Sequence, residues 1–518
     1  MAVTPLTALR APTREKVRTT LQRERHEPEY GILVATIALA AIGILMVYSS
    51  SAIKSYLAKD DPFAIVGPQI QWAALGLVAM VVMMRVDYRW LRVVSVPLFA
   101  IGIISLLLVF IPAINVEVGG SARWLKLGPL PAVHPAEFMK LALVVYLAHW
   151  FAKRGTEVHG LLSGTLPFLV IVGPIVLLVL LEPDLGTSSV LAFTAFTLFF
   201  LAGANLLHLV GMAAAAIPVV AMLFMRGYQM ARITAWLDPW SQASGDGFHS
   251  VQGFFALALG GLLGAGLGES RLAGGLFLPN AFNDFIFAIV GEELGFIGAA
   301  GLLALFGLFA YTGMRIAKRS VDPFLRLLTA TATAWVIGQV FINVGYVIGL
   351  LPVTGIQLPL ISAGGTSTAT TLFMVGLMAN AARHEPAAVA ALRAGRDDKM
   401  NRLLRLPLPE PYLPTRTEAL RDRLRAPERA AGKKSARASA AAKKPTKPPK
   451  RPPRNSEAPR PEKRRARDTP TAKAKSKGAG GHYGGASQSR RAAAANRKAQ
   501  HGTGRPRRSR TLEGQRYG

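Results

Sequence analysis

The sequence predicts an all-α polytopic membrane protein with about ten transmembrane helices, a large extracytoplasmic loop and a disordered basic C-terminal tail. Residues 31–382 contain repeated apolar runs close to the roughly 20 residues that cross a bilayer as a helix. Residues 383–518 are rich in Pro, Ala, Lys and Arg and have no apolar periodicity. Lys and Arg also recur in alternate loops between the runs, as the loops of a threaded membrane protein do.

The net charge of the chain, +30, lies almost wholly in the tail. Residues 383–518 contain 37 Lys and Arg against 11 Asp and Glu, a net charge of +26. Low hydrophobicity combined with high net charge predicts disorder. The absence of Cys excludes disulfides, Cys-ligated zinc and thiol catalysis.

Each apolar run is expected to form a helix, because a backbone in lipid must satisfy its own hydrogen bonds. The first run follows Tyr30 and is too long for the core of a signal peptide, so we expect it to remain as a helix. The predicted spans are 31–50, 65–84, 91–113, 136–153, 163–181, 187–203, 205–225, 285–313, 325–350 and 359–382. Residues 1–30 then form a basic N-terminus, 31–382 the membrane domain and 383–518 the tail.

The distribution of basic residues predicts the orientation of these spans. Basic residues precede the first span and follow the second, fourth and eighth, for example at Arg85, Lys153 and Arg315. Such loops face the cytoplasm, so we expect both termini there, in a multi-pass protein of the plasma membrane. The loop 226–284 then faces outward. Because cytosolic nucleotides are absent outside, a reaction there needs a substrate with its own leaving group.

Asp284 is the first candidate for chemistry. It closes the only long predicted loop, at the start of an apolar run. A carboxylate at a membrane boundary costs free energy unless it is used.

Glu137 and Lys140 follow Pro135 at the start of a predicted span and lie three residues apart, on one helix face. They form either a self-neutralising pair that stabilises packing or an ion pair that lines a polar cavity, and their depth in the membrane favours the cavity. Arg123, beside Trp124, either binds a phosphate or anchors the chain at the membrane interface.

Other polar or irregular segments have structural and functional interpretations. Asp184 lies in a short outward turn and either caps the next helix or faces a site. The Gly-rich run 260–268 is typical of a phosphate cradle or of close helix packing. Glu292 and Glu293 lie inside a span and are either functional or paired with Arg or the backbone. The Pro- and Gly-broken stretch 352–367 at membrane depth is expected to line a cavity.

Together these motifs resemble the SEDS family (shape, elongation, division, sporulation), which includes FtsW and RodA. The matching segments, in this order, are 120–124, 134–140, 182–187, 232–240, 278–295, 341–345 and 351–366. Segments of the tail at 382–386, 401–407 and 512–518 are similar to the actinobacterial FtsW branch. The chain departs from the family at 134–137, where the family usually has Gln-Pro-Ser-Glu, and at 363–367, where it often has Tyr-Gly-Gly-Ser-Ser.

The resemblance implies a peptidoglycan glycosyltransferase that polymerises lipid II on the outer face of the plasma membrane, at the division septum. The expected partners are a class B penicillin-binding protein (an FtsI-like transpeptidase) and other divisome proteins. The family's essential acid matches Asp284, which we expect to act as general base on the acceptor hydroxyl. The leaving diphosphate needs cations, which either Arg side chains or a divalent cation near Asp284, Mg²⁺ or Mn²⁺, would supply.

The predicted substrate-binding residues share polar side chains or a broken backbone on the outward side. Arg123, Lys140 and Arg232 are expected to hold phosphates, and Glu137 to orient Lys140. The full set is Arg123, Glu137, Lys140, Arg232, Gln252, Ser362, Gly364 and Gly365.

Two rival functions fit part of the pattern. A flippase for lipid II would also have many spans with intramembrane acids, but its charges should lie at the midplane, open to both sides. A scaffold that only anchors partners leaves those acids unexplained. Basic clusters in the tail predict either adhesion to the anionic cytoplasmic leaflet or recruitment of an acidic partner such as FtsZ. Nucleic acid is not expected as a partner, because the tail is tethered to a membrane.

Overall fold

The computed structural model describes residues 14–118, 121–126, 132–224, 227–273, 277–279, 281–394 and 402–413. Gly119, Gly120 and the tail beyond Leu413 lie outside the described residues. The described helices are α1 (Arg14–Lys59), α2 (Val66–Arg85), α3 (Tyr88–Leu108), α4 (Pro135–Arg154), α5 (Leu166–Leu181), α6 (Leu185–Leu201), α7 (Leu206–Phe224), α8 (Gly227–Leu237), α9 (Phe248–Gly260), α10 (Ile286–Arg319), α11 (Pro323–Val347), α12 (Gly365–Arg383) and α13 (Pro386–Arg393). The short turns η1 (Gly155–His159) and η2 (Leu161–Thr165) connect α4 to α5.

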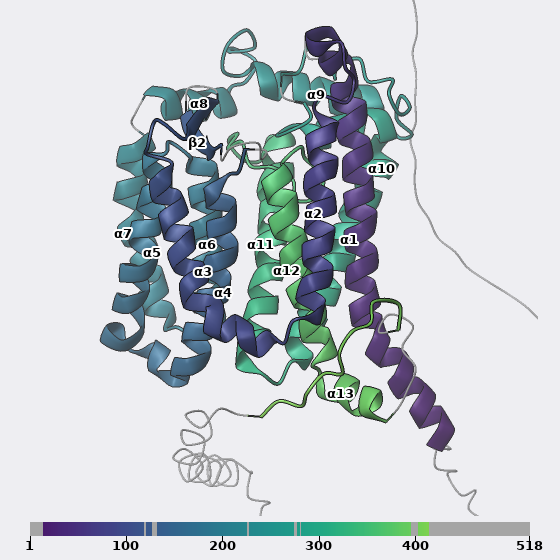
Figure 1. Ribbon diagram of the computed structural model, residues 1–518. Coiled ribbons are helices and arrows are strands. Elements are labelled where there is room, and N and C mark those ends of the chain that lie inside the picture. The colour runs from purple at the N-terminus through teal and green to yellow at the C-terminus, as the bar shows by residue number, and fades with distance from the viewer. Residues whose placement is uncertain are drawn as a thin grey trace, which may run out of the picture. The chain divides into compact units, whose positions relative to one another are not determined.

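The predicted fold class, a helical membrane protein, is confirmed. Six of the described helices are long and apolar enough to cross a membrane: Gly31–Lys59, Val66–Arg85, Tyr88–Leu108, Leu161–Leu181, Ile286–Arg319 and Pro323–Val347. α6 and part of α7 are apolar but shorter. α4 and α12 carry more polar residues and run alongside the others in Figure 1. The count of ten spans stays a prediction.

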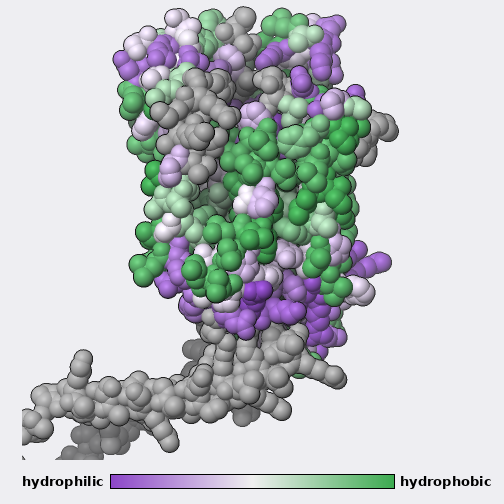
Figure 2. Space-filling model, turned by 90° about the vertical axis from the view of Figure 1, so that its left-hand side faces the viewer, coloured by the Kyte–Doolittle hydropathy of each residue, from purple (hydrophilic) through white to green (hydrophobic). Residues whose placement is uncertain are grey.

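The surface of the helix bundle fits a membrane. Figure 2 shows a wide apolar belt between two polar edges on the face that includes α5 and α7. Within the bundle, α2 packs along α12, α1 along α10, and α3 along α4, while α11 contacts α4, α6 and α10. α4, α11 and α12 are the most thoroughly buried, which explains their polar composition: their polar side chains face protein rather than lipid.

One end of the bundle carries most of the irregular structure (Figure 1, top). There the predicted loop 114–135 contains a two-stranded antiparallel hairpin, β1 (Asn115–Val118) and β2 (Ser121–Leu125). The long predicted loop 226–284 contains α8 and α9. We call this the hairpin end. The distribution of Lys and Arg predicts that this end faces outward.

The opposite end, which we call the tail end, binds the start of the C-terminal tail. Arg85 Nη2 donates to Leu404 O at 2.7 Å, and Arg383 Nη2 donates to Pro407 O at 2.6 Å. Arg89 Nη1 lies 2.6 Å from Glu410 Oε2. The first part of the predicted tail therefore contains the helix α13 and a segment, 402–413, that is bonded to the helix ends.

α10 is broken at Gly295, whose φ of +68° interrupts the helical hydrogen bonds. The Gly-rich run beside it supplies the missing partners. Phe296 N donates to Gly261 O at 2.9 Å, while Ala265 N donates to Glu292 O at 2.9 Å. Of the two interpretations of this run, the structure favours packing, because its backbone forms hydrogen bonds with both halves of α10.

Glu292 and Glu293, just before the break, are both buried and both bonded. Glu292 accepts from Ser270 Oγ at 2.5 Å and from Arg271 N at 2.8 Å. Glu293 accepts from Ser49 Oγ at 2.6 Å. These acids therefore have a structural role: they fasten the first half of α10 to α1 and to the loop that follows α9.

We expect Gly295→Ala to destabilise the protein by roughly 1–3 kcal/mol, because its φ of +68° and ψ of −171° lie in a region that is essentially confined to Gly. A Cβ at this position would also lie 2.3 Å from Gly264 N, which belongs to the Gly-rich run. Thermal unfolding in detergent should show a lower midpoint. Gly301→Ala, on the same helix with no atom within 4 Å of its Cβ, is the matched control. Equal midpoints for the two variants would contradict this account.

Candidate functional site

Asp284 lies at the hairpin end, in the turn that leads into α10. Its backbone carbonyl is held from α11, where Asn343 Nδ2 donates to it at 3.0 Å and the Tyr346 hydroxyl at 2.9 Å. The same two side chains also reach Ile356 O, the Nδ2 at 2.8 Å and the hydroxyl oxygen at 2.7 Å, so the single hydroxyl proton of Tyr346 is shared between the two carbonyls. One pair of residues, three apart on α11, therefore fixes both the Asp284 turn and the segment that passes Ile356.

This irregular segment, residues 352–357, lines two cavities, and we call it the partition. Pro352, Val353 and Thr354 line one cavity. Gly355, Ile356 and Gln357 line the other. Gly355 has a φ of +74°, and a Cβ there would lie 3.6 Å from Asp284 Oδ2. The carboxylate of Asp284 therefore lies against the partition, beside the middle of the segment.

The surroundings of Asp284 change its acidity. Its side chain is only partly exposed, and burial raises the pKa of the carboxyl to about 6, against the opposing positive charge of Arg232. A carboxyl with a pKa near the working pH is suited to accept a proton from a substrate. Asp184 also raises the pKa of Asp284, and Arg123 lowers it, so these charged groups act on one site.

The first cavity is an apolar groove of about 570 Å³ between α5, α6 and α7. Its walls are formed by Leu, Val, Phe, Ala and Met side chains, for example Leu177 of α5, Phe196 of α6 and Met212 of α7. Arg232 of α8 lies at one end and donates to Val353 O of the partition at 3.3 Å. A long apolar groove with a guanidinium at its end suits a ligand with a hydrocarbon chain and an anionic head.

The second cavity is polar, with a volume of about 120 Å³, and we call it the polar cavity. The predicted pair Glu137 and Lys140 lines it, with Lys140 Nζ 2.7 Å from Glu137 Oε1. This location bears out the cavity interpretation of the pair. The full lining is Arg123, Trp124, His134, Glu137, Lys140, Asp184, Thr187, Val190, Gln339, Gly355, Ile356, Gln357, Gly364, Thr366 and Ser367.

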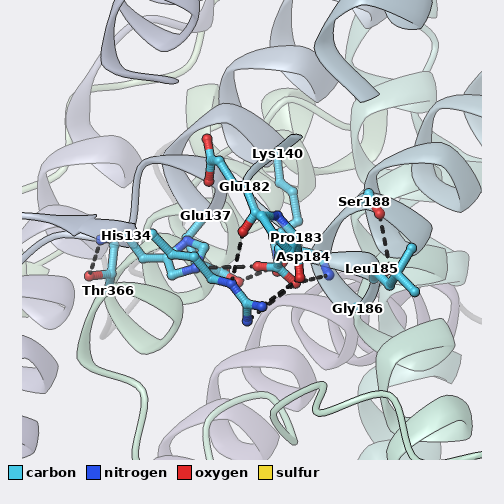
Figure 3. A network of polar contacts seen from close by, with 12 residues as sticks. His134, Glu137, Lys140, Glu182, Pro183, Asp184, Leu185, Gly186, Ser188 and Thr366 are labelled. Carbon is cyan, nitrogen blue, oxygen red and sulfur yellow. Dashed lines mark hydrogen bonds and ion pairs between the residues drawn. The ribbon is translucent and has the colours of Figure 1, made fainter. Parts of the chain in front are cut away.

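Asp184 is the centre of the polar network at the mouth of this cavity (Figure 3). Its Oδ1 accepts from Thr187 N at 2.9 Å, so it caps α6, and its Oδ2 lies 3.5 Å from His134 Nε2. Arg123 Nη1 lies 4.0 Å from Asp184 Oδ1, and Arg123 also donates to Pro183 O at 2.5 Å. Asp184 therefore has both the capping role and a place in the site.

The pKa values of the two acids of this turn, Glu182 and Asp184, are shifted in opposite directions. Burial raises the pKa of Glu182 to about 8, and the charge of Asp184 adds to the effect. Burial would also raise the pKa of Asp184, but contacts with His134 and Arg123 hold it well below its usual range. Paired carboxyls with separated pKa values are a common property of functional sites.

The remaining predicted substrate-binding residues either contact the protein itself or lie outside both cavities. Ser362 Oγ accepts from Leu358 N at 2.8 Å, which shapes the bend after the partition. Gly364 N donates to Gln69 Oε1 at 3.1 Å, and a Cβ on Gly365 would lie 2.0 Å from the Trp72 ring. Gln252 lies on α9 and lines neither cavity. Their roles as substrate contacts stay predictions.

Four further polar residues near the site were not predicted from the sequence: Gln339, Asn343 and Tyr346 of α11, and His249 of α9. His249 stacks on Phe285 with ring centroids 5.9 Å apart, and burial lowers its pKa, with Arg232 adding to the effect. Polar residues at helical spacing in an otherwise apolar span were the signal for Gln339, Asn343 and Tyr346. No group of three or more metal-ligating side chains occurs among the residues that the structure describes.

Comparisons with known proteins agree with this architecture. A family model described as a cell cycle protein, covering FtsW, RodA and SpoVE, matches residues 30–387. The "Probable peptidoglycan glycosyltransferase FtsW" of Mycobacterium tuberculosis is 46% identical over 488 residues, covering 94% of this chain and 89% of that protein. The "Stage V sporulation protein E" of Bacillus subtilis is 37% identical over 362 residues, covering 70% and 98%.

Two solved structures share the fold. A chain from a structure described as "Structural coordination of polymerization and crosslinking by a peptidoglycan synthase complex" has a TM-score of 0.57 and 28% identity, covering 69% of this chain and 98% of that one. The rod shape determining protein RodA of Thermus thermophilus has a TM-score of 0.51 and 26% identity, covering 69% and 97%. The chain therefore belongs to the FtsW, RodA and SpoVE family, as its resemblance to SEDS proteins predicts.

Proposed function

We propose that the protein is a peptidoglycan glycosyltransferase that polymerises lipid II into glycan strands during septal wall synthesis. The observation that carries this proposal is the position of Asp284 on a partition between a polar cavity and an apolar groove headed by Arg232. Lipid II joins a sugar to a hydrocarbon chain through a diphosphate, so its three parts match the polar cavity, the groove and the guanidinium between them. The names of the FtsW relatives support the same activity.

The reaction needs one base and one anion-binding group. The acceptor 4-hydroxyl attacks C1 of the donor sugar, the bond between C1 and the diphosphate oxygen breaks, and the hydroxyl proton passes to Asp284. The diphosphate leaves with the electron pair of the broken bond, and Arg232 stabilises its charge. Asp284 is also the residue that would hold the Mg²⁺ or Mn²⁺ predicted from the sequence, and such an ion would neutralise the diphosphate.

The partners and location extend this proposal. A class B penicillin-binding protein is the proposed partner, supported by the solved neighbour whose description joins polymerisation to crosslinking. Cytoplasmic termini are supported by the basic residues at the tail end, including Arg85, Lys153 and Lys318. Location at the septum, other divisome partners and recruitment of FtsZ by the tail are part of the same proposal.

Reconstitution with lipid II tests the activity. The purified protein in lipid vesicles, with its cognate transpeptidase, should produce glycan ladders from externally added lipid II. Transfer of lipid II across the vesicle membrane is measured in parallel. Transfer without ladders would overturn the proposal in favour of a flippase, and ladders without transfer would support it.

The acidity of Asp284 predicts the pH dependence of polymerisation. Because the base must be ionised, kcat/KM should rise with pH and level off above about 6, where burial places the pKa of Asp284. Arg232→Gln should move this break to higher pH, because the positive charge of Arg232 lowers the pKa of Asp284. A break near pH 4 in the wild type, or no movement in the variant, would contradict the assignment.

A further inference from the structure

The polar cavity contains two buried polar atoms that lack a hydrogen-bond partner. Glu137 and His134 are each only 9% exposed and line the cavity. Glu137 Oε2 and His134 Nδ1 have no hydrogen-bond partner among the residues that the structure describes. The carboxylate oxygen is an acceptor, whereas Nδ1 donates or accepts according to the tautomer of the ring. A ligand that brings O–H or N–H groups would satisfy the buried carboxylate oxygen.

The charges of the cavity wall are already balanced. Lys140 lies 2.7 Å from Glu137, and Arg123 lies 4.0 Å from Asp184. A diphosphate bound here would bring further negative charge beside two carboxylates. An ionised diphosphate also has only acceptor atoms, so it would leave Glu137 Oε2 unpaired. The wall therefore suits a neutral ligand better than the anion that the sequence analysis assigned to Arg123 and Lys140.

The rest of the lining is suited to a sugar. Gln339 is 3% exposed and presents an amide, which can both donate and accept. Trp124 contributes an aromatic ring, and Lys140 and Thr366 contribute donors. A volume of about 120 Å³ admits part of a sugar ring with an acetamido group, but not a disaccharide with its peptide.

We propose that the polar cavity is the subsite for an N-acetylated sugar ring, and that the diphosphate is held on the other side of the partition, at Arg232. This inference rests on the proposed function, because it takes the sugar to be part of the same lipid-linked substrate. It assigns the diphosphate to Arg232 alone, whereas the sequence predicted that Arg123 and Lys140 hold phosphates as well.

Saturation-transfer NMR on the full-length protein in nanodiscs tests the proposal without requiring activity. The probes are N,N′-diacetylchitobiose, a neutral N-acetylated disaccharide, and inorganic pyrophosphate. The variants are Gln339→Leu, which replaces the amide with an apolar group of similar size, and Arg232→Gln. Ser105→Ala is the control, because its hydroxyl bonds only to the carbonyl of Gly102 on its own helix.

The expected result is transfer to the acetamido methyl groups in wild type, Ser105→Ala and Arg232→Gln, with at least a fivefold loss in Gln339→Leu. Pyrophosphate should not compete with the disaccharide. Competition by pyrophosphate, equal transfer in Gln339→Leu, or no transfer in the wild type would each overturn the sugar subsite. Failure of the proposed function is distinguishable, because it would appear as absent glycan ladders with the binding pattern intact.

Discussion

Asp284→Asn is expected to lower the rate of lipid II polymerisation by about 100- to 10,000-fold, the range that general-base catalysis contributes. The amide has the size of the carboxylate but cannot accept the proton of the acceptor hydroxyl. The fold should survive, because Asn343 and Tyr346 hold the backbone carbonyl of residue 284 rather than its side chain. The measurement is the initial rate of glycan formation by the purified complex.

The control for this variant is ligand binding. Asp284→Asn should still show saturation transfer to N,N′-diacetylchitobiose, since its side chain does not line the polar cavity. A variant that binds the sugar but makes no polymer would locate the defect in the chemical step. Full polymerisation by a correctly folded Asp284→Asn variant would exclude Asp284 as the base.

Glu137→Ala is expected to have the largest effect on stability, about 3–5 kcal/mol, which is typical for removing one partner of a buried ion pair. Lys140 is 1% exposed, and its Nζ lies 2.7 Å from Glu137 Oε1. Removing the carboxylate leaves a buried ammonium that lies 5.2 Å from the centre of the Trp335 ring. Thermal or denaturant unfolding in detergent would measure the loss.

The double variant Glu137→Ala with Lys140→Met is the matched control. It removes both charges and keeps an unbranched side chain at 140, so most of the lost stability should return. Polymerisation should not return, because the cavity wall has lost its polar groups. If the double variant were as unstable as Glu137→Ala, the ion pair would not be the cause.

Much of the bundle follows from local sequence. The predicted spans 65–84 and 163–181 correspond to the apolar helical segments Val66–Arg85 and Leu161–Leu181 within a residue or two, because apolar length alone decides where a helix crosses lipid. The sequence did not predict the break at Gly295, which lies inside the predicted span 285–313. That break depends on hydrogen bonds to residues 261–266, and no pattern within α10 itself encodes them.

The functional site likewise has some features that the sequence predicts and others that it does not. Asp284 is predictable because a carboxylate at the end of a loop and the start of an apolar run is unusual in itself. The pairing of Glu137 with Lys140 follows from helical spacing. By contrast, the partition forms only when α11 brings Asn343 and Tyr346 to both Asp284 and Ile356. Such convergence of distant segments cannot be read from spacing along the chain.

The wall between the polar cavity and the groove is formed by the partition together with α6, which contributes Thr187 to the cavity and Ser188 to the groove, and this wall has a consequence for processivity. On the proposed function, the saccharide lies on one side of residues 352–357 and the hydrocarbon anchor on the other. Only the narrow link between them has to pass the wall. The contacts between enzyme and product would then be independent of product length, because a glycan of any length passes the partition through the same diphosphate link. The length of the glycan would be determined by other components of cell-wall synthesis.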